Sequence, residues 1–134
     1  MNRKLLACFT VVIGLFLGAA TAFAHHGTAA SYDPDKSITL TGAVSRFVWA
    51  NPHGQLHWDV KDQSGKVVTW GGELHSIALL TRSGWNKNII KAGDTVTVTG
   101  HPSRAGTPYM VVTSVKLSNG KEYFRDLPEQ GQEQ

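Results

Sequence analysis

Two short segments that alternate apolar and polar residues constrain the fold of this chain more than any other feature. Residues 56–60 and 68–72 alternate in this way, and Gln-Ser-Gly at residues 63–65 lies between them. A three-residue loop that ends in glycine is a common hairpin connection. With this loop Trp58 faces Trp70 and the apolar faces coincide, whereas a shift of one residue would set apolar against polar side chains. The sequence therefore predicts a β-hairpin with one apolar face.

The rest of the chain adds strands and one short helix. The expected elements are a long, bent strand over 38–49, a helix over 77–82 with Ser76 as its N-cap, strands over 95–101 and 109–117, and a short strand over 122–124. Three strands, a helix and then further strands are the element order of an OB-type barrel. We predict an all-β, OB-like small barrel of five to six strands, with one short helix between the third and fourth strands.

The first 24 residues have the three-part pattern of a secretory signal peptide. Arg3 and Lys4 precede an apolar run over residues 5–17, and a small-x-small site follows at residues 22–24. The apolar run is shorter than the roughly 20 residues that a bilayer requires. We therefore expect a periplasmic or secreted protein with no membrane anchor after cleavage. In an alternative interpretation Cys8 belongs to a lipoprotein signal, which would leave a very short apolar core.

Removal of this leader changes the charge and the thiol content. Lys and Arg fall from 13 to 11 against 10 acidic residues, so the net charge falls from +3 to +1. A near-neutral domain lacks the basic surface of nucleic-acid-binding proteins, so we expect no nucleic-acid partner. The only cysteine, Cys8, leaves with the leader. After residues 1–24 we predict a polar arm over 25–37, the barrel over 38–126 and a disordered tail over 127–134.

Several motifs along the chain are shared with a known group of proteins. They are the segments 25–27, 38–42, 51–53, 82–85, 91–100 and 119–121, together with Trp70 and Glu73. The Asn-Pro-His corner, combined with the Ser-Gly-Trp and Gly-Asp motifs, is the most specific part. With these motifs the chain resembles a family of small exported bacterial proteins known only as a domain of unknown function. The resemblance implies a compact β domain outside the cytoplasm, and it implies no activity.

The density of histidines is the sharpest chemical signal. All six follow the leader, at positions 25, 26, 53, 57, 75 and 101, and we assign no role to His101. Cleavage after residue 24 would give His25 a free α-amino group beside its imidazole, and His26 would offer a second chelate. Nitrogen-rich tetragonal ligation suits Cu(II), so copper is the expected metal and zinc the second choice. The alternative is an arm whose histidines are merely solvated.

A second group of ligands is expected on the polar face of the hairpin. The register places His53 opposite His75, with Glu73 on the same face and His57 farther along it. Opposed residues have Cβ atoms about 4.5–5.5 Å apart, so two imidazoles and a carboxylate could share a zinc or copper ion. The alternative is that these are ordinary histidines on a wet strand face, with His53 capping the corner before it.

Catalysis has little support in the sequence. Ser64, Ser76 and Ser83 lie in turn or cap contexts, and no phosphate-binding glycine loop is present, so we expect no enzyme. Trp58 and Trp70 belong to the apolar face and therefore to the core. Trp49 and Tyr109 are less determined, and they are the candidates for an exposed groove that binds a peptide or glycan.

Three classes of function follow from these observations. The first is an exported metal-binding accessory or carrier protein, with copper held by His25 and His26 and helped by His53, His57 or His75. The second is a periplasmic interaction module that docks a protein, peptide or glycan and has no metal role. The third is a structural subunit of an envelope complex. The partner is an unknown envelope protein or a small ligand.

Overall fold

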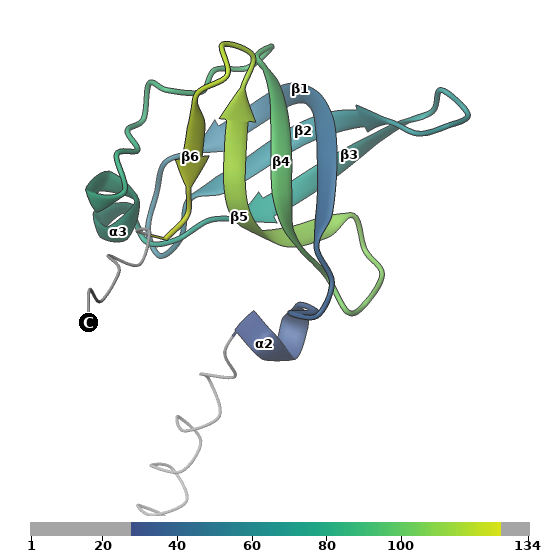
Figure 1. Cartoon of the computed structure of the whole chain (residues 1–134), viewed down its shortest axis with the longest axis horizontal. Helices are drawn as coiled ribbons and strands as arrows, with labels where there is room; N and C mark the ends of the chain where they lie inside the picture. The colour runs from purple at the N-terminus through teal and green to yellow at the C-terminus, as the bar shows by residue number, and fades with distance from the viewer. Residues whose placement is uncertain (1–27, 127–134) are drawn as a thin grey trace, which may run out of the picture.

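The computed structural model describes residues 28–126 (Figure 1). The predicted leader, His25, His26 and the predicted tail lie outside the described residues. The elements in chain order are α2 (Thr28–Ser31), β1 (Ile38–Val48), β2 (Gln55–Lys61), β3 (Val67–Glu73), α3 (Ile77–Arg82), β4 (Thr95–Pro102), β5 (Tyr109–Leu117) and β6 (Glu122–Phe124). Within the described part of the chain, no helix is long and apolar enough to cross a bilayer.

The strands form one sheet that closes into a barrel. The strand order is β3-β2-β1-β4-β5-β6, and β3 also pairs with β5 in parallel. This last pairing closes five strands into a barrel, and β6 extends the sheet beyond it. The helix α3 lies between β3 and β4 in the chain and at one side of the barrel in space (Figure 1). The predicted OB-like barrel with one short helix between the third and fourth strands is confirmed, whereas α2 was not predicted.

The β2–β3 hairpin has the predicted register. Gln55 pairs with Glu73, Trp58 with Trp70, and the pairing continues without a shift to the loop. The Asp62 N–H donates to the Lys66 carbonyl oxygen at 2.9 Å, which closes the three-residue loop. Because the register is regular, every second residue of β2 and β3 lies on the same face of the sheet.

Strand β1 bends and pairs with two neighbouring strands. Its first half pairs with β4 and its second half with β2, and the register shifts between Val44 and Arg46. Gly42 lies at the crossover between the two halves, where an added Cβ would collide with the Asp59 carbonyl oxygen. The absence of a side chain at Gly42 therefore lets β1 pass close to β2 as it changes partner.

The core fills the inside of the barrel with apolar side chains. Trp58 and Leu56 of β2 are fully buried, as the alternation predicts. Trp85, which follows α3, is also buried, packs against Tyr123 with ring centroids 5.5 Å apart, and donates its indole N–H to the Phe124 carbonyl oxygen at 2.7 Å. Trp85 therefore fastens β6 to the barrel through one apolar and one polar contact.

Candidate functional site

Glu73, the last residue of β3, joins two parts of the chain that are distant in sequence. Its Oε1 lies 2.9 Å from Nδ1 of His53, and its Oε2 accepts a hydrogen bond from the Tyr32 hydroxyl at 2.9 Å. His53 stands just before β2, and Tyr32 directly follows α2. One carboxylate thus connects the β1–β2 corner to the segment that leads to the amino terminus.

The contact with Glu73 sets the orientation of His53. When the imidazole is neutral, Nδ1–H donates to the carboxylate, so Nε2 carries the free lone pair. The His53 side chain is 44% exposed, and among the described residues its Nε2 makes no hydrogen bond or ion pair. Histidines that bind metals usually donate their other ring N–H to a carboxylate or carbonyl, which fixes the tautomer in this way. The contact of Nδ1–H of His53 with the Glu73 carboxylate is therefore typical of a metal-binding histidine.

His75 lies beside His53 but has the opposite tautomer. The two rings meet edge to face with centroids 6.4 Å apart. The Ser76 N–H donates to Nδ1 of His75 at 2.9 Å, so a neutral His75 carries its proton on Nε2, which lies 3.7 Å from the Asp126 carboxylate. Burial lowers the pKa of His75, and the charge of Arg125 lowers it further. His75 is thus a neutral neighbour whose Nε2 holds a proton rather than a free lone pair.

Ser76 occupies the predicted N-cap position of α3 but makes no side-chain capping hydrogen bond. Its own N–H donates to Nδ1 of His75.

The described residues do not by themselves complete a metal site. Among residues 28–126, no group of three or more His, Cys, Asp or Glu side chains could hold a metal ion. Glu73 uses one oxygen for His53 and the other for Tyr32, so it acts here as an orienting group. His53, His75 and Glu73 do lie together as the register predicted, but a metal at this corner needs ligands from elsewhere.

His57 lies on the same face and away from this corner. It pairs with Gly71, and an added Cβ on Gly71 would collide with the Tyr109 ring. Burial lowers the pKa of His57, and the charge of Arg46 adds to the effect. In the described part of the chain, no hydrogen bond or ion pair joins His57 to Glu73, so the structure separates this predicted ligand from the other three.

The two aromatic residues proposed for a binding groove are each partly covered. Tyr109 packs against the buried Tyr32 with ring centroids 6.4 Å apart and planes 23° from parallel. Trp49 packs against Phe47 at 5.8 Å, on the border of the core. Burial raises the pKa of Tyr109, and the negative charge of Glu73 raises it further. Tyr109 therefore supports the segment at Tyr32, while Trp49 belongs to a different group of rings.

The described part of the predicted polar arm is docked on the barrel. The Asp33 N–H donates to the Pro102 carbonyl oxygen at 2.9 Å, and the Arg104 N–H donates to the Ser31 carbonyl oxygen at 2.9 Å. The Arg104 guanidinium also donates through Nε to the Tyr32 carbonyl oxygen at 3.1 Å. These bonds attach the segment after α2 to the loop between β4 and β5.

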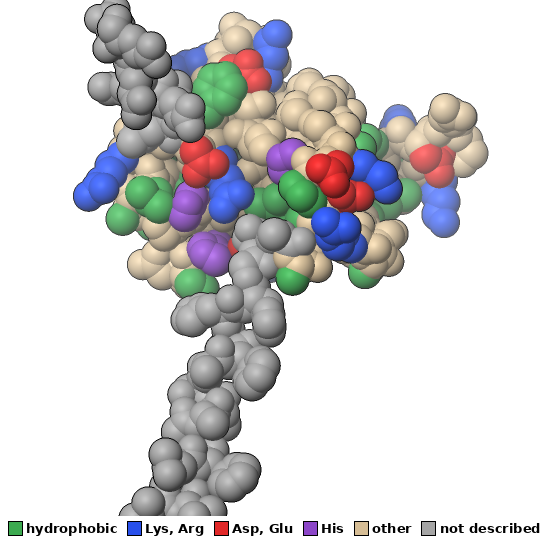
Figure 2. Space-filling view, turned by 60° about the horizontal axis from the view of Figure 1, so that its bottom comes forward, with side chains coloured by type: hydrophobic (Ala, Val, Ile, Leu, Met, Phe, Trp, Pro, Cys, Tyr) green, Lys and Arg blue, Asp and Glu red, His purple; other side chains and the backbone are tan. Residues whose placement is uncertain are grey.

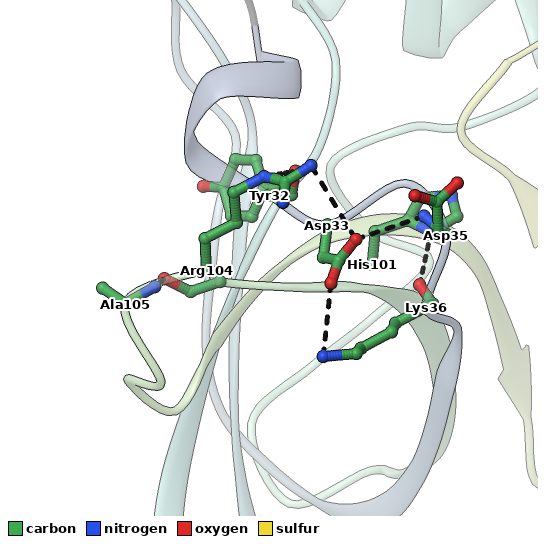
Figure 3. A network of polar contacts seen from close by, with 8 residues as sticks. Tyr32, Asp33, Asp35, Lys36, His101, Arg104 and Ala105 are labelled. Carbon is green, nitrogen blue, oxygen red and sulfur yellow. Dashed lines mark hydrogen bonds and ion pairs between the residues drawn. The ribbon is translucent and has the colours of Figure 1, made fainter.

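Side chains around Asp33 complete the attachment (Figure 3). The Asp33 carboxylate lies 3.3 Å from the Lys36 ammonium and 3.8 Å from the Arg104 guanidinium. Partial desolvation acts to raise the pKa of Asp33, but the hydrogen bonds from Lys36 and the Asp35 N–H, with the charges of Arg104 and Lys36, outweigh it, so the pKa is lowered. His101 Nδ1 lies 2.7 Å from the Lys36 carbonyl oxygen, to which it donates. His101, to which the sequence assigned no role, thus holds the residue that leads into β1.

The residues that sequence reasoning missed are Tyr32, Arg104 and His101. Tyr32 and Arg104 are 72 positions apart in the chain, and no periodic pattern connects them. The histidine, acidic and basic side chains come to the surface together on the face turned forward in Figure 2. This face is where the docked segment meets the barrel.

Comparisons with known proteins give a family and no activity. The model of a family described as "Family of unknown function (DUF6152)" matches residues 14–111. No curated protein and no solved structure matches the chain.

Proposed function

We infer the function from the residues of this chain itself, because the chain belongs to DUF6152, a family of unknown function. We propose that it is an exported copper-binding accessory or carrier protein without catalytic activity. The metal would be held by the processed amino terminus, His25 and His26, and by Nε2 of His53. Export rests on the signal-peptide pattern of residues 1–24.

The observation that carries this proposal is that the Glu73 carboxylate contacts both His53 and Tyr32. Its Oε1 receives Nδ1–H of His53 and thereby exposes Nε2, while its Oε2 holds Tyr32 and thereby the chain that leads to His25. Loss of a carboxylate that orients a metal-binding histidine commonly lowers the metal affinity about 10–100-fold. Glu73 therefore supports both a ligand from the barrel and the approach of the amino terminus.

The length of the chain allows the two parts to meet. Tyr32 and His53 bind the same carboxylate, and only six residues lie between His25 and Tyr32. Residues 28–31 are helical and rise about 1.5 Å each. The three residues before them can extend by roughly 10 Å in total. His25 can therefore reach the side of the barrel on which His53 lies.

The resulting donor set favours copper over zinc. The α-amino group and imidazole of His25, the imidazole of His26 and Nε2 of His53 are all nitrogen donors. Four nitrogen donors in a tetragonal arrangement suit Cu(II), and the general affinity order also favours copper over zinc. His75 is not one of the proposed ligands, because its Nε2 carries a proton in the observed arrangement.

The test is a Cu(II) titration of the protein recovered after export, with its first residue established by mass spectrometry. We expect one copper ion per chain with submicromolar affinity. One extra residue before His25 should abolish this affinity, and His53→Gln should weaken binding and remove one nitrogen from the Cu(II) paramagnetic resonance spectrum.

Matched variants separate orientation from general damage. Glu73→Gln should weaken copper binding about 10–100-fold. His57→Gln, on the same face but without contact to Glu73, should leave it unchanged. Undiminished affinity with a blocked amino terminus would contradict the proposal and favour an interaction module, which replacement of Trp49 or Tyr109 would then probe.

A further inference from the structure

The outer edge of β3 has no partner over its first half. Strand β3 pairs with β2 along residues 67–73, but β5 reaches only Gly71, Gly72 and Glu73. Among the described residues, no strand pairs with the outer side of Val67–Trp70. In Figure 1 this end of the hairpin projects beyond the barrel. A strand edge of this kind is a template for pairing with another chain.

The free backbone groups on this edge can be assigned from the register. Asp62 and Lys66 form a hydrogen-bonded pair at the loop, so even-numbered residues of β3 bond to β2 and odd-numbered residues point outward. Gly71 confirms this, because its N–H donates outward to the Pro108 carbonyl oxygen at 3.0 Å. Val67 and Thr69 therefore direct two N–H and two C=O groups to the open edge.

The four residues of the open edge include none of the charged residues, prolines or bulges that usually prevent pairing. Val67-Val68-Thr69-Trp70 contains no charge, no proline and no register shift. Val67 is 51% exposed, one of two exposed large hydrophobic residues in the described chain. Natural proteins usually blunt an open edge with lysine, proline or a bulge.

The opposite edge of the sheet is protected. Strand β6 has only three residues, and Trp85 donates to the Phe124 carbonyl oxygen. A head-to-tail arrangement of β3 on β6 would also build an open filament rather than a closed dimer. The outer side of residues 38–42 in β1 also has no strand partner among the described residues, but a contact of β3 with β1 would be heterologous in the same way. A closed two-fold dimer through β3 therefore requires that the β3 edge meets an identical edge.

We propose that two copies of the chain pair antiparallel through the β3 edge, about a two-fold axis at Val68. In this register Val67 of each copy faces Thr69 of the other. Four intermolecular hydrogen bonds then use all the outward N–H and C=O groups of Val67 and Thr69. A register centred on Thr69 is excluded, because it would require the Gly71 amide that already bonds to Pro108.

The side chains fit this register. Val68 meets its own copy on the axis, the exposed Val67 is covered by Thr69, and Lys66 of one copy lies against Trp70 of the other. No like charges face each other. Because the contact is short, we expect a weak dimer that depends on protein concentration.

The first test places a cysteine on the axis. In a Cys8→Ser background an introduced cysteine is the only thiol of the full chain. Opposed residues in a non-hydrogen-bonded pair have Cα atoms about 4.5 Å apart, which a disulfide can bridge. Val68→Cys should form a disulfide-linked dimer under mild oxidation. Val60→Cys, which opposes Val68 one strand farther in, is the matched control and should remain monomeric.

The second test uses sedimentation velocity over about 1 µM to 1 mM protein. We expect dimer formation that Val67→Lys abolishes and that Ala43→Lys does not affect, because Ala43 is exposed and its strand is paired there on both sides, with β2 and with β4. A monomer at every concentration, or equal cross-linking of Val60→Cys and Val68→Cys, would overturn the proposal. Both tests are independent of copper binding.

Discussion

The interior of the barrel and the segment docked on its outside are held by different kinds of contact. Inside, Trp58, Leu56 and Val98 are fully buried and pack against each other's apolar surfaces. Outside, residues 32–36 are held mainly by hydrogen bonds and ion pairs to the β4–β5 loop and to Glu73. Apolar burial stabilises the whole fold. Each of these polar contacts adds little to the stability, and together they mainly fix where residues 32–36 lie on the barrel.

This difference separates stability from function. The barrel should survive loss of the docked segment, because none of the fully buried core side chains belongs to that segment. The proposed site should not, because Tyr32 and His53 share one carboxylate. Substitutions in the two regions should therefore have different effects.

The largest effect is expected from Trp58→Ala. This fully buried side chain packs in the core and contacts Trp70 with centroids 6.4 Å apart. Loss of a buried tryptophan commonly costs about 3–5 kcal/mol. The free energy of unfolding, measured with urea, should fall by this order.

Trp70→Ala is the control for this experiment, since Trp70 is only half-buried. Trp70→Ala should lower the free energy of unfolding clearly less than Trp58→Ala does. Equal losses for the two variants would show that burial does not account for the stability of this hairpin.

A smaller effect on stability is expected from Tyr32→Phe. The variant loses the hydrogen bond to Glu73, which is worth about 1 kcal/mol. The Asp33 amide, which donates to the Pro102 carbonyl oxygen, should exchange its hydrogen faster while amides of β2 stay protected. Tyr109→Phe is the matched control, because the Tyr109 hydroxyl has no hydrogen-bond partner among the described residues. Unchanged exchange at Asp33 would show that Glu73 does not hold the segment.

The same bond predicts an alkaline dependence of docking. Burial raises the pKa of Tyr32, and the hydrogen bond and charge of Glu73 raise it further. Because the folded pKa lies above the unfolded value of about 10, docking is fully stabilised below pH 10 and weakens as the pH rises above it. Amide exchange at Asp33, corrected for intrinsic rates, should follow this dependence.

The smallest effect is an acid dependence shared by His57 and His75. Burial is the first cause that lowers the pKa of each, so the folded state favours the neutral imidazoles. Their contribution to stability is present above the unfolded pKa of about 6.5 and is lost as the pH falls through the lower folded values. In urea unfolding between pH 7.5 and 5, His57→Gln and His75→Gln should each reduce the loss of stability. Unchanged slopes in both variants would contradict this assignment.

Much of the fold was predictable because its signals are local. The alternation of residues 56–60 and 68–72 with the intervening Gln-Ser-Gly set the hairpin register, and that register brought His53, His75 and Glu73 together. The tautomers of the two histidines were not predictable. They depend on the Ser76 amide, which donates to Nδ1 of His75, and on the Glu73 carboxylate, which lies at Nδ1 of His53.

The strands, the hairpin register and the closeness of the corner histidines could be read from the sequence, because hydrophobic alternation and turn geometry act between near neighbours in the chain. The three-dimensional fold was needed to show that Glu73 contacts both Tyr32 and His53, that His101 and Arg104 hold the docked segment, and that the outer edge of β3 lacks a partner over residues 67–70. Each of these depends on where the closing barrel brings distant residues, and that placement leaves no periodic trace in the sequence.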